Sequence, residues 1–184
     1  LISIDGSPDG RTVCVVDASH HGSLITAAGT ADLGVVDLCS FTTAGVALGS
    51  SSGSIQLVDP TTKQRRPLLS RTTRLVHMTV SHGPGKAWIA AAFLDATLWR
   101  VDLETGQQAT TPVSSVPKQI AIRPDGTMVF PEINRLVLWA PNNELSTLAV
   151  FPKPIDSVSL FGDRATVFTA GGLGYTIELA TKQV

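Results

Sequence analysis

An acidic residue recurs along the chain at nearly even spacing, and carboxylates are among the side chains most able to do chemistry. The acid closes a short apolar run at Asp17, Asp59, Asp102 and Glu178, and Ala140 takes its place in a degenerate copy. The steps between these positions are 42, 43, 38 and 38 residues. Such recurrence favours architecture over catalysis, because an acid at a strand end can accept backbone hydrogens of the following turn. We therefore predict structural roles for Asp17, Asp59, Asp102 and Glu178.

The other motifs with chemical potential are incomplete. Gly85-Lys86 is followed by Ala87, where a phosphate-binding loop needs Ser or Thr as a magnesium ligand. His20-His21 has no further ligands at a spacing that would suit zinc, so both histidines are expected in an exposed turn. Residues 171–174, Gly-Gly-Leu-Gly, lie between two predicted strands and indicate a tight hairpin. The sequence predicts no catalytic residue, no cofactor and no metal site.

One segment carries an unusual concentration of positive charge. Five of the 14 basic residues fall within residues 63–74, and no acid interrupts them. The candidate contact residues for a partner are Lys63, Arg65, Arg66, Arg71 and Arg74. One interpretation is protection of an outermost strand, because charge and proline on an edge block unwanted pairing. The alternative is contact with RNA phosphates or with an acidic protein, although aromatic residues for base stacking are lacking nearby.

The elements that position these residues are short strands. Runs of four to eight residues rich in Val, Ile, Leu and Thr alternate with Gly, Pro, Asp and Ser, and amphipathic helix patterns are nearly absent. A repeat of roughly 40 residues with four strands per unit predicts a β-propeller. We predict an all-β, partial β-propeller of about four and a half four-stranded antiparallel blades, part of a larger ring of about seven blades. Residues 1–184 form one propeller domain or propeller fragment, with approximate blades 1–28, 29–70, 71–113, 114–151 and 152–184.

Strands can be assigned within each unit. The clearest unit has strands at residues 75–81, 86–93, 97–102 and 107–113. The preceding unit has 34–40, 45–49, 54–59 and 66–69, and the following one has 118–122, 127–132, 135–139 and 145–151. The last unit has 156–161, 165–170, 174–179 and a short outer strand at 182–184.

The first unit allows two registers. The 42-residue step from Asp17 to Asp59 makes residues 1–4, 12–17 and 24–27 its second, third and outer strands. Alternatively, the turn Pro8-Asp9-Gly10 matches Pro124-Asp125-Gly126, which would make residues 1–4 an innermost strand. We prefer the first register because it keeps the repeat even.

Composition limits the function classes. Lys plus Arg number 14 and Asp plus Glu 15, so net charge gives no drive toward nucleic acid or an anionic membrane. The longest apolar run, residues 87–94, is far shorter than the roughly 20 residues of a membrane helix. Leu1 starts an apolar alternation without a basic flank, so we expect no signal peptide. Cys14 and Cys39 are expected to be buried, reduced thiols, which favours a reducing, intracellular compartment and most simply the cytoplasm.

The repeat resembles the WD-repeat β-propeller family in a divergent form. The third strand of that family ends in Trp-Asp, and here the corresponding pairs are Val58-Asp59, Val101-Asp102, Trp139-Ala140 and Ile177-Glu178. The turns Glu104-Thr105-Gly106 and Pro124-Asp125-Gly126 are also typical of such repeats, whereas the Gly-His pair that opens many of them is missing. The resemblance implies a rigid, non-enzymatic platform that holds partners on its faces and rim.

These observations together predict a non-catalytic protein-interaction scaffold, a subunit of a larger protein complex with no membrane partner. The alternative is a ligand-binding or hydrolytic propeller, lactonase-like or quinoprotein-like, with acids converging at the channel mouth. By loop position, the acids that would serve that alternative are Asp5, Asp95, Glu132 and Asp163.

Overall fold

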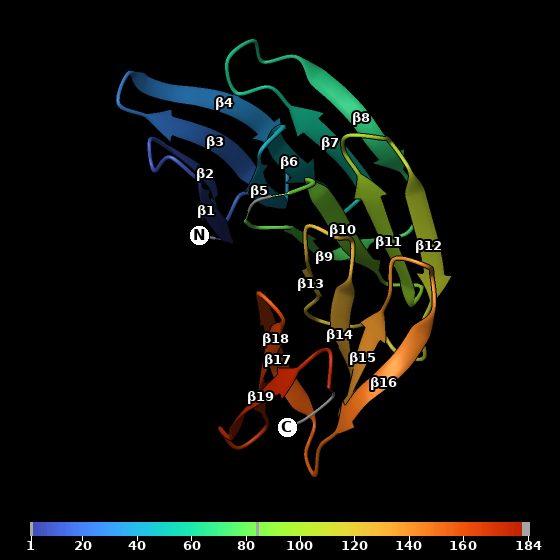
Figure 1. Ribbon diagram of the computed structural model, residues 1–184. Coiled ribbons are helices and arrows are strands. Elements are labelled where there is room, and N and C mark those ends of the chain that lie inside the picture. Colours follow the sequence, from blue (N-terminus) through green and yellow to red (C-terminus); the bar gives the residue numbers. More distant parts are fainter. Residues whose placement is uncertain (1, 84, 182–184) are drawn as a thin grey trace.

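The computed structural model describes residues 2–83 and 85–181, and this part of the chain consists of β-strands without an α-helix. The strands form five antiparallel sheets, four with four strands and one with three. The sheets follow one another around an open arc, with the first and last sheets at its two ends (Figure 1). In each sheet the first strand lies on the concave side of the arc, and the fourth, where described, lies on the convex side.

The strands are short and follow one another in chain order within each sheet. The first sheet contains β1 (Ser3–Gly6), β2 (Thr12–Val16), β3 (His21–Thr26) and β4 (Gly29–Val35). The second contains β5 (Leu38–Thr42), β6 (Gly45–Gly49), β7 (Ser54–Val58) and β8 (Arg65–Ser70). The third contains β9 (Leu75–Val80), β10 (Trp88–Phe93), β11 (Thr97–Asp102) and β12 (Gln108–Pro112). The fourth contains β13 (Ala121–Ile122), β14 (Met128–Glu132), β15 (Arg135–Trp139) and β16 (Leu145–Val150), and the fifth contains β17 (Ile155–Phe161), β18 (Arg164–Thr169) and β19 (Gly174–Glu178).

Several hairpin turns contain a residue with a left-handed backbone. Ala96, Gly126 and Asn143 have φ angles of 57°, 85° and 69°. In each turn the amide of this residue donates to the carbonyl three positions earlier, as Gly126 does to Arg123 at 2.9 Å. A type I turn followed by a left-handed residue is a favoured connection between antiparallel strands.

The core lies between the sheets. Successive side chains of a strand point to opposite faces, so a strand between two sheets can be apolar throughout. On β10, Ile89 and Phe93 pack toward the second sheet, whereas Ala90 and Ala92 pack toward the fourth. Buried clusters of this kind fill all the spaces between neighbouring sheets.

A buried arginine joins the third and fourth sheets. Arg100 on β11 is 1% exposed and donates to the carbonyls of Gly126, Trp139 and Ala140 at 2.5, 3.2 and 2.7 Å. Its guanidinium carbon also lies 4.1 Å from the centroid of the Trp139 ring. A buried charge is tolerated when hydrogen bonds replace its hydration, and these carbonyls provide them.

The predicted fold class is confirmed: the chain is all-β, and its separate antiparallel sheets are consistent with a partial propeller. In the third sheet each predicted strand matches an observed one within two residues. The outer strand predicted at 182–184, and residue 1 of the first predicted strand, lie outside the described residues.

The preferred strand register of the first unit is wrong. β1 is the innermost strand of a complete four-stranded sheet, and β4 (Gly29–Val35) belongs to this sheet rather than to the next. The innermost strand of the second sheet consequently begins at Leu38 instead of residue 34. The even spacing was misleading because Asp17 caps the turn after a second strand, whereas Asp59 follows a third strand. The match between the two Pro-Asp-Gly turns was the correct signal.

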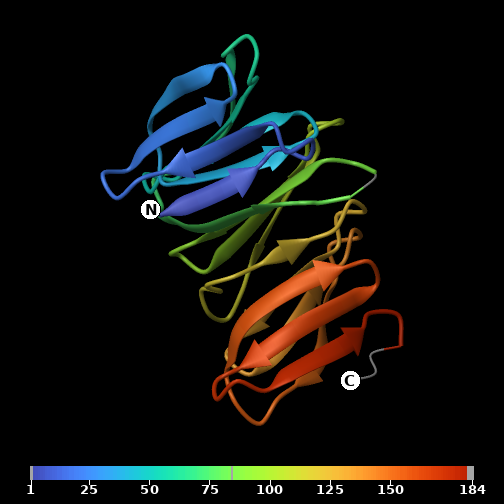
Figure 2. The same cartoon turned by 90° about the vertical axis from the view of Figure 1, so that its left-hand side faces the viewer.

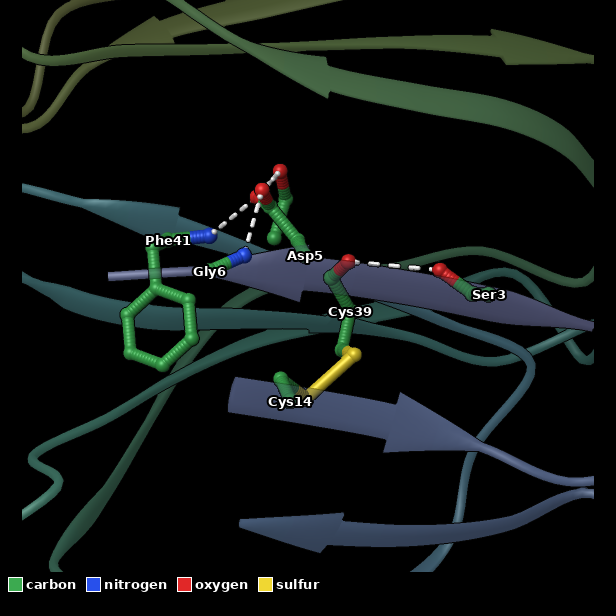
Figure 3. Close-up of a disulfide and its surroundings, with 7 residues drawn as sticks. Ser3, Asp5, Gly6, Cys14, Cys39 and Phe41 are labelled. Atoms are coloured by element: carbon green, nitrogen blue, oxygen red, sulfur yellow. Dashed lines mark hydrogen bonds between the residues drawn. A yellow bond between two sulfur atoms is a disulfide. The ribbon is translucent and has the colours of Figure 1, made fainter. Parts of the chain in front are cut away.

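The expectation of reduced cysteines is also wrong. Cys14 on β2 and Cys39 on β5 form a disulfide between the first and second sheets, with their Cα atoms 6.3 Å apart (Figure 3). Both residues are buried, at 0% and 3% exposure. Their side chains face each other across the space between two sheets, and a separation of 25 residues in sequence does not show this. The disulfide therefore ties the first sheet covalently to the rest of the arc.

The described part of the chain contains no helix that is both long and apolar enough to cross a lipid bilayer.

Removing the disulfide should destabilise the protein. We expect the Cys14→Ala/Cys39→Ala variant to lose about 3 kcal/mol of unfolding free energy, because the bond constrains the unfolded chain over about 25 residues. Urea unfolding followed by circular dichroism measures this. Dithiothreitol should weaken the wild-type protein and leave the double variant unchanged. Two thiols titratable in denaturant without reductant would contradict the disulfide.

Replacing the buried arginine should separate the third and fourth sheets. We expect Arg100→Met to lower the free energy of unfolding by about 3 kcal/mol, because several buried carbonyls lose their donor. Arg100→Lys should recover only part of this stability, because a single ammonium group cannot reproduce the planar set of donors of the guanidinium. Arg66→Met, an exposed arginine on β8, is the matched control and should unfold like the wild type. We call the set of Arg100 hydrogen bonds to the fourth sheet the Arg100 clamp. Equal stability of Arg100→Met and Arg66→Met would show that this clamp does not stabilise the fold.

Candidate functional site

Two of the recurring acids cap identical turns. Asp59 accepts hydrogen bonds from the amides of Thr61 and Thr62 at 2.7 and 2.9 Å. Asp102 accepts from the amides of Glu104 and Thr105 at 2.9 and 3.2 Å. The fourth residue after each acid has a left-handed backbone, with φ of 62° at Lys63 and 74° at Gly106. Both acids therefore cap the turn that follows the third strand of their sheet.

The other two recurring acids lie in different settings. Asp17 follows the second strand of its sheet and accepts from the amides of Ser19 and His21 at 2.8 and 3.1 Å. Glu178 ends a third strand, but its carboxylate accepts from Arg164 on the neighbouring strand at 2.6 Å. Asp17 therefore caps a turn at the end of its sheet opposite to the end where Asp59 and Asp102 lie in theirs. Glu178 forms a cross-strand ion pair.

Asp102 has the most distinctive electrostatic environment of the four. Burial to 2% exposure disfavours its charged form, but Lys86 Nζ, 2.9 Å from Oδ2, and the two turn amides outweigh this effect. The pKa of the Asp102 carboxyl is consequently lowered from its ordinary value of 3.8. Hydrogen bonds from the amides of Thr62 and Thr61 likewise lower the pKa of the exposed Asp59 carboxyl. A carboxyl held in its charged form suits a cap and cannot act as a general acid near neutral pH.

The basic segment does not form one surface. Lys63, Arg65 and Arg66 lie at the start of β8 or in the turn before it, whereas Arg71 and Arg74 follow its end. A strand of six residues extends for about 20 Å, so the two groups lie at opposite ends of the sheet. Arg65 donates to the carbonyl of Leu33 at 2.6 Å, which ties the outer strands of the first two sheets together.

Arg71 is also committed within the chain. Its guanidinium lies 4.7 Å from the centroid of the Phe93 ring and 3.5 Å from the Asp95 carboxylate. The exposed basic side chains of the segment are Lys63, Arg65, Arg66 and Arg74. The structure thus divides the predicted contact surface into two smaller groups.

The acids expected at a channel mouth are not brought together. Asp5 accepts from Ser40 and from the amide of Phe41, and Asp95 pairs with Arg71. Glu132 pairs with Arg135, and Asp163 pairs with Arg123, at 2.6 and 2.9 Å. Asp95 and Glu132 lie at the strand ends opposite to the turn that holds Asp163. Within residues 2–83 and 85–181, no group of three or more His, Cys, Asp or Glu side chains could hold a metal ion.

His20 and His21 lie in and after a turn, as expected, and each contacts a carboxylate. His20 Nδ1 lies 2.5 Å from Asp37, and His21 Nε2 lies 2.9 Å from Asp32. The two histidines therefore contact two separate acids and do not converge on a shared metal site.

Polar side chains on the concave side close the free edges of the innermost strands. The Asp5 carboxylate accepts from the Phe41 amide at 2.8 Å, and Gln119 Oε1 accepts from the Val158 amide at 3.1 Å (Figure 3 for Asp5). Burial lowers the pKa of the His77 imidazole on the same side, and the backbone of Ile120 on the next sheet acts against this shift. Each of these contacts runs from one sheet to the next, and no local motif in the sequence predicts any of them.

A cavity of about 660 Å³ opens on the concave side, between the innermost strands of the third, fourth and fifth sheets. Its wall includes His77, His82, Gln119, Arg123, Leu160 and Phe161. These strands lie side by side along the arc, as Figure 2 shows from the concave side. None of the four acids expected at a channel mouth lines this cavity.

The two ends of the arc expose large apolar side chains. On the first sheet, Ile4 and Ile25 are 61% and 44% exposed, and on the last sheet Phe168 is 49% exposed. These residues alternate with the buried residues of the same strands, such as Leu24 and Val167. They therefore occupy the faces that have no neighbouring sheet.

No protein-family model and no curated protein matches this chain.

Lowering the pH should reduce the free energy of unfolding, partly through Asp102. A carboxyl whose pKa is lowered on folding stabilises the folded state above its unfolded pKa, and this contribution is lost as the pH falls through its folded pKa. Asp102→Asn should lower the free energy of unfolding at neutral pH by about 2 kcal/mol. The variant should also lose less stability than the wild type between about pH 5 and about pH 2.

Urea unfolding at each pH measures this difference. Glu144→Gln, which removes an exposed carboxylate from another turn, should follow the wild-type pH profile. Parallel pH profiles for Asp102→Asn and the wild type would show that the Lys86–Asp102 contact does not stabilise the fold.

Proposed function

We propose that this protein is a non-catalytic interaction scaffold that works within a larger protein assembly. The exposed apolar side chains at the two ends of the arc, Ile4 and Ile25 on the first sheet and Phe168 on the last, carry this proposal. Soluble domains rarely leave contiguous apolar faces open unless a partner covers them. Inside the arc the equivalent faces are buried against the next sheet, so the chemistry of the missing partner is that of another apolar sheet face.

The same reasoning supports a larger ring. Propellers usually have about four to eight blades, and an arc of five sheets leaves room for about two more. Sheets that dock on Ile4 and Ile25 at one end and on Phe168 at the other would complete a ring of about seven blades. The likeness to WD-repeat proteins, whose rings act as platforms, agrees with this proposal.

The disulfide supports a proposal about the compartment. The cytoplasmic location expected from the sequence rested on reduced thiols, and the Cys14–Cys39 disulfide removes that support. Disulfides persist chiefly in oxidising compartments. We therefore propose such a compartment for the scaffold rather than the cytoplasm.

Polar substitutions at the two ends test the scaffold. The tagged protein should co-purify from its native source with a partner in fixed stoichiometry, and Ile4→Ser with Phe168→Ser should abolish that association by removing apolar contact area. Size-exclusion chromatography with light scattering measures the stoichiometry, and crosslinking should place the partner on β1, β3 or β18.

Val150→Ser is the matched control. Val150 is 65% exposed on β16, an outer strand away from both ends, so its replacement should leave the association intact. A partner retained equally by the end-face variant, or no stoichiometric partner at all, would refute the scaffold role.

A further inference from the structure

The cavity on the concave side has the size of a ligand site. Its volume of about 660 Å³ lies within the range of about 300–1,000 Å³ typical of small-molecule pockets. Three sheets contribute to it, through β9, β13, β17 and the turns that follow these strands. A pocket assembled from several rigid sheets is largely formed before any ligand arrives.

Much of the wall is apolar. Val80, Ile122 and Leu160 line the cavity, and Phe161 stands at its edge with 89% of its surface exposed. A phenyl ring left so open to water is an available contact for another flat apolar group. The wall therefore suits a ligand with a planar or cyclic apolar body.

A few polar groups lie among these apolar residues. The Gln119 oxygen already accepts from the Val158 amide, so the side chain offers its Nε2 hydrogens to a ligand. Burial lowers the pKa of His77, which favours the neutral imidazole. Such an imidazole offers one donor and one acceptor. Both residues supply directional hydrogen bonds without a charge.

The one arginine in the wall is neutralised within the chain. Arg123 lies 2.9 Å from the Asp163 carboxylate and 3.4 Å from that of Asp125. A cation that already has two carboxylate partners gives little attraction for an anionic ligand. The wall thus selects by shape and hydrogen bonding rather than by charge.

The strand edges argue against an extended peptide as the ligand. A peptide that adds to a sheet needs free backbone groups along an edge strand. Here Gln119 occupies the Val158 amide of β17. The edge of β17 that borders the cavity is therefore partly closed by a side chain.

We propose that this cavity binds an uncharged, amphipathic small molecule whose apolar ring system contacts Leu160 and Phe161 and whose polar edge bonds to Gln119 and His77. This site meets the end faces that carry the scaffold role only at Phe161, which the strand register places on the same side of the last sheet as Phe168. The protein would thus combine a protein-binding periphery with a small-molecule site on its concave side.

Binding of N-phenyl-1-naphthylamine, an uncharged aromatic dye whose fluorescence rises in apolar surroundings, tests the proposal. The wild-type protein should bind it saturably, and Thr79→Trp, which places an indole in the cavity, should weaken binding by about tenfold or more. The end-face variant Ile4→Ser with Phe168→Ser should bind the dye like the wild type, whether or not it has lost its protein partner.

Nuclear magnetic resonance on the unmodified protein gives a second measurement that needs no variant. The dye should shift amide signals of residues 119–123 and 158–162 and leave those of residues 3–6 unchanged. Lack of saturable binding, or shifts confined to the first sheet, would overturn the proposal. So would dye binding that Thr79→Trp retains and the end-face variant loses.

Discussion

The fold depends on one constraint: a sheet that is apolar on both faces must be covered on both faces. β10 illustrates it, because all of its residues from Ile89 to Phe93 are buried, alternately against the second and the fourth sheet. No single sheet can satisfy this alone, so each becomes stable by packing on its neighbours. An arc of such sheets has two ends, and at each end one face stays open. The exposed Ile4 and Phe168 are thus direct consequences of the arrangement that buries Ile89 and Ala90.

A second constraint concerns the edges of the sheets rather than their faces. The innermost strand of every sheet is an edge strand, and its unpaired backbone groups need partners. Neighbouring sheets supply two of these partners through Asp5 and Gln119. The polar residues on the concave side therefore contribute first to architecture. A ligand can still bond to the polar atoms of these side chains that no neighbouring sheet occupies, such as Gln119 Nε2, and it can contact the apolar wall of the cavity.

The sequence allowed good prediction wherever the signal was local. The period of about 40 residues and the turns after Asp59 and Asp102 depend on adjacent residues, and the strands of the third sheet were accordingly placed within two residues. In the first sheet two local signals conflict: the even spacing predicts the wrong register, and the Pro-Asp-Gly turn predicts the right one. The Cys14–Cys39 bond, the Arg100 clamp and the Gln119 contact all join residues 25 to 40 positions apart. Such contacts depend on how sheets stack, which a repeat period alone does not specify.

The two ends of the arc are held differently, and this asymmetry follows from the same packing. An end sheet has one neighbour instead of two, so it buries less apolar surface and opens more easily. The first sheet compensates with a disulfide, with Ser40 and Phe41 bonded to Asp5, and with Arg65 bonded to Leu33 (Figure 3 for Asp5 and the disulfide). In the described residues the last sheet is joined to the fourth by an apolar cluster, the Gln119 contact, a hydrogen bond from the Ile155 amide to the Ile133 carbonyl and the Arg123–Asp163 pair. The Asp163 carboxylate is exposed, and ion pairs with an exposed partner contribute little. The last sheet is therefore the end that gains more stability when another sheet covers it, and β17 also forms one wall of the cavity. Docking at that end would consequently also make the cavity more rigid.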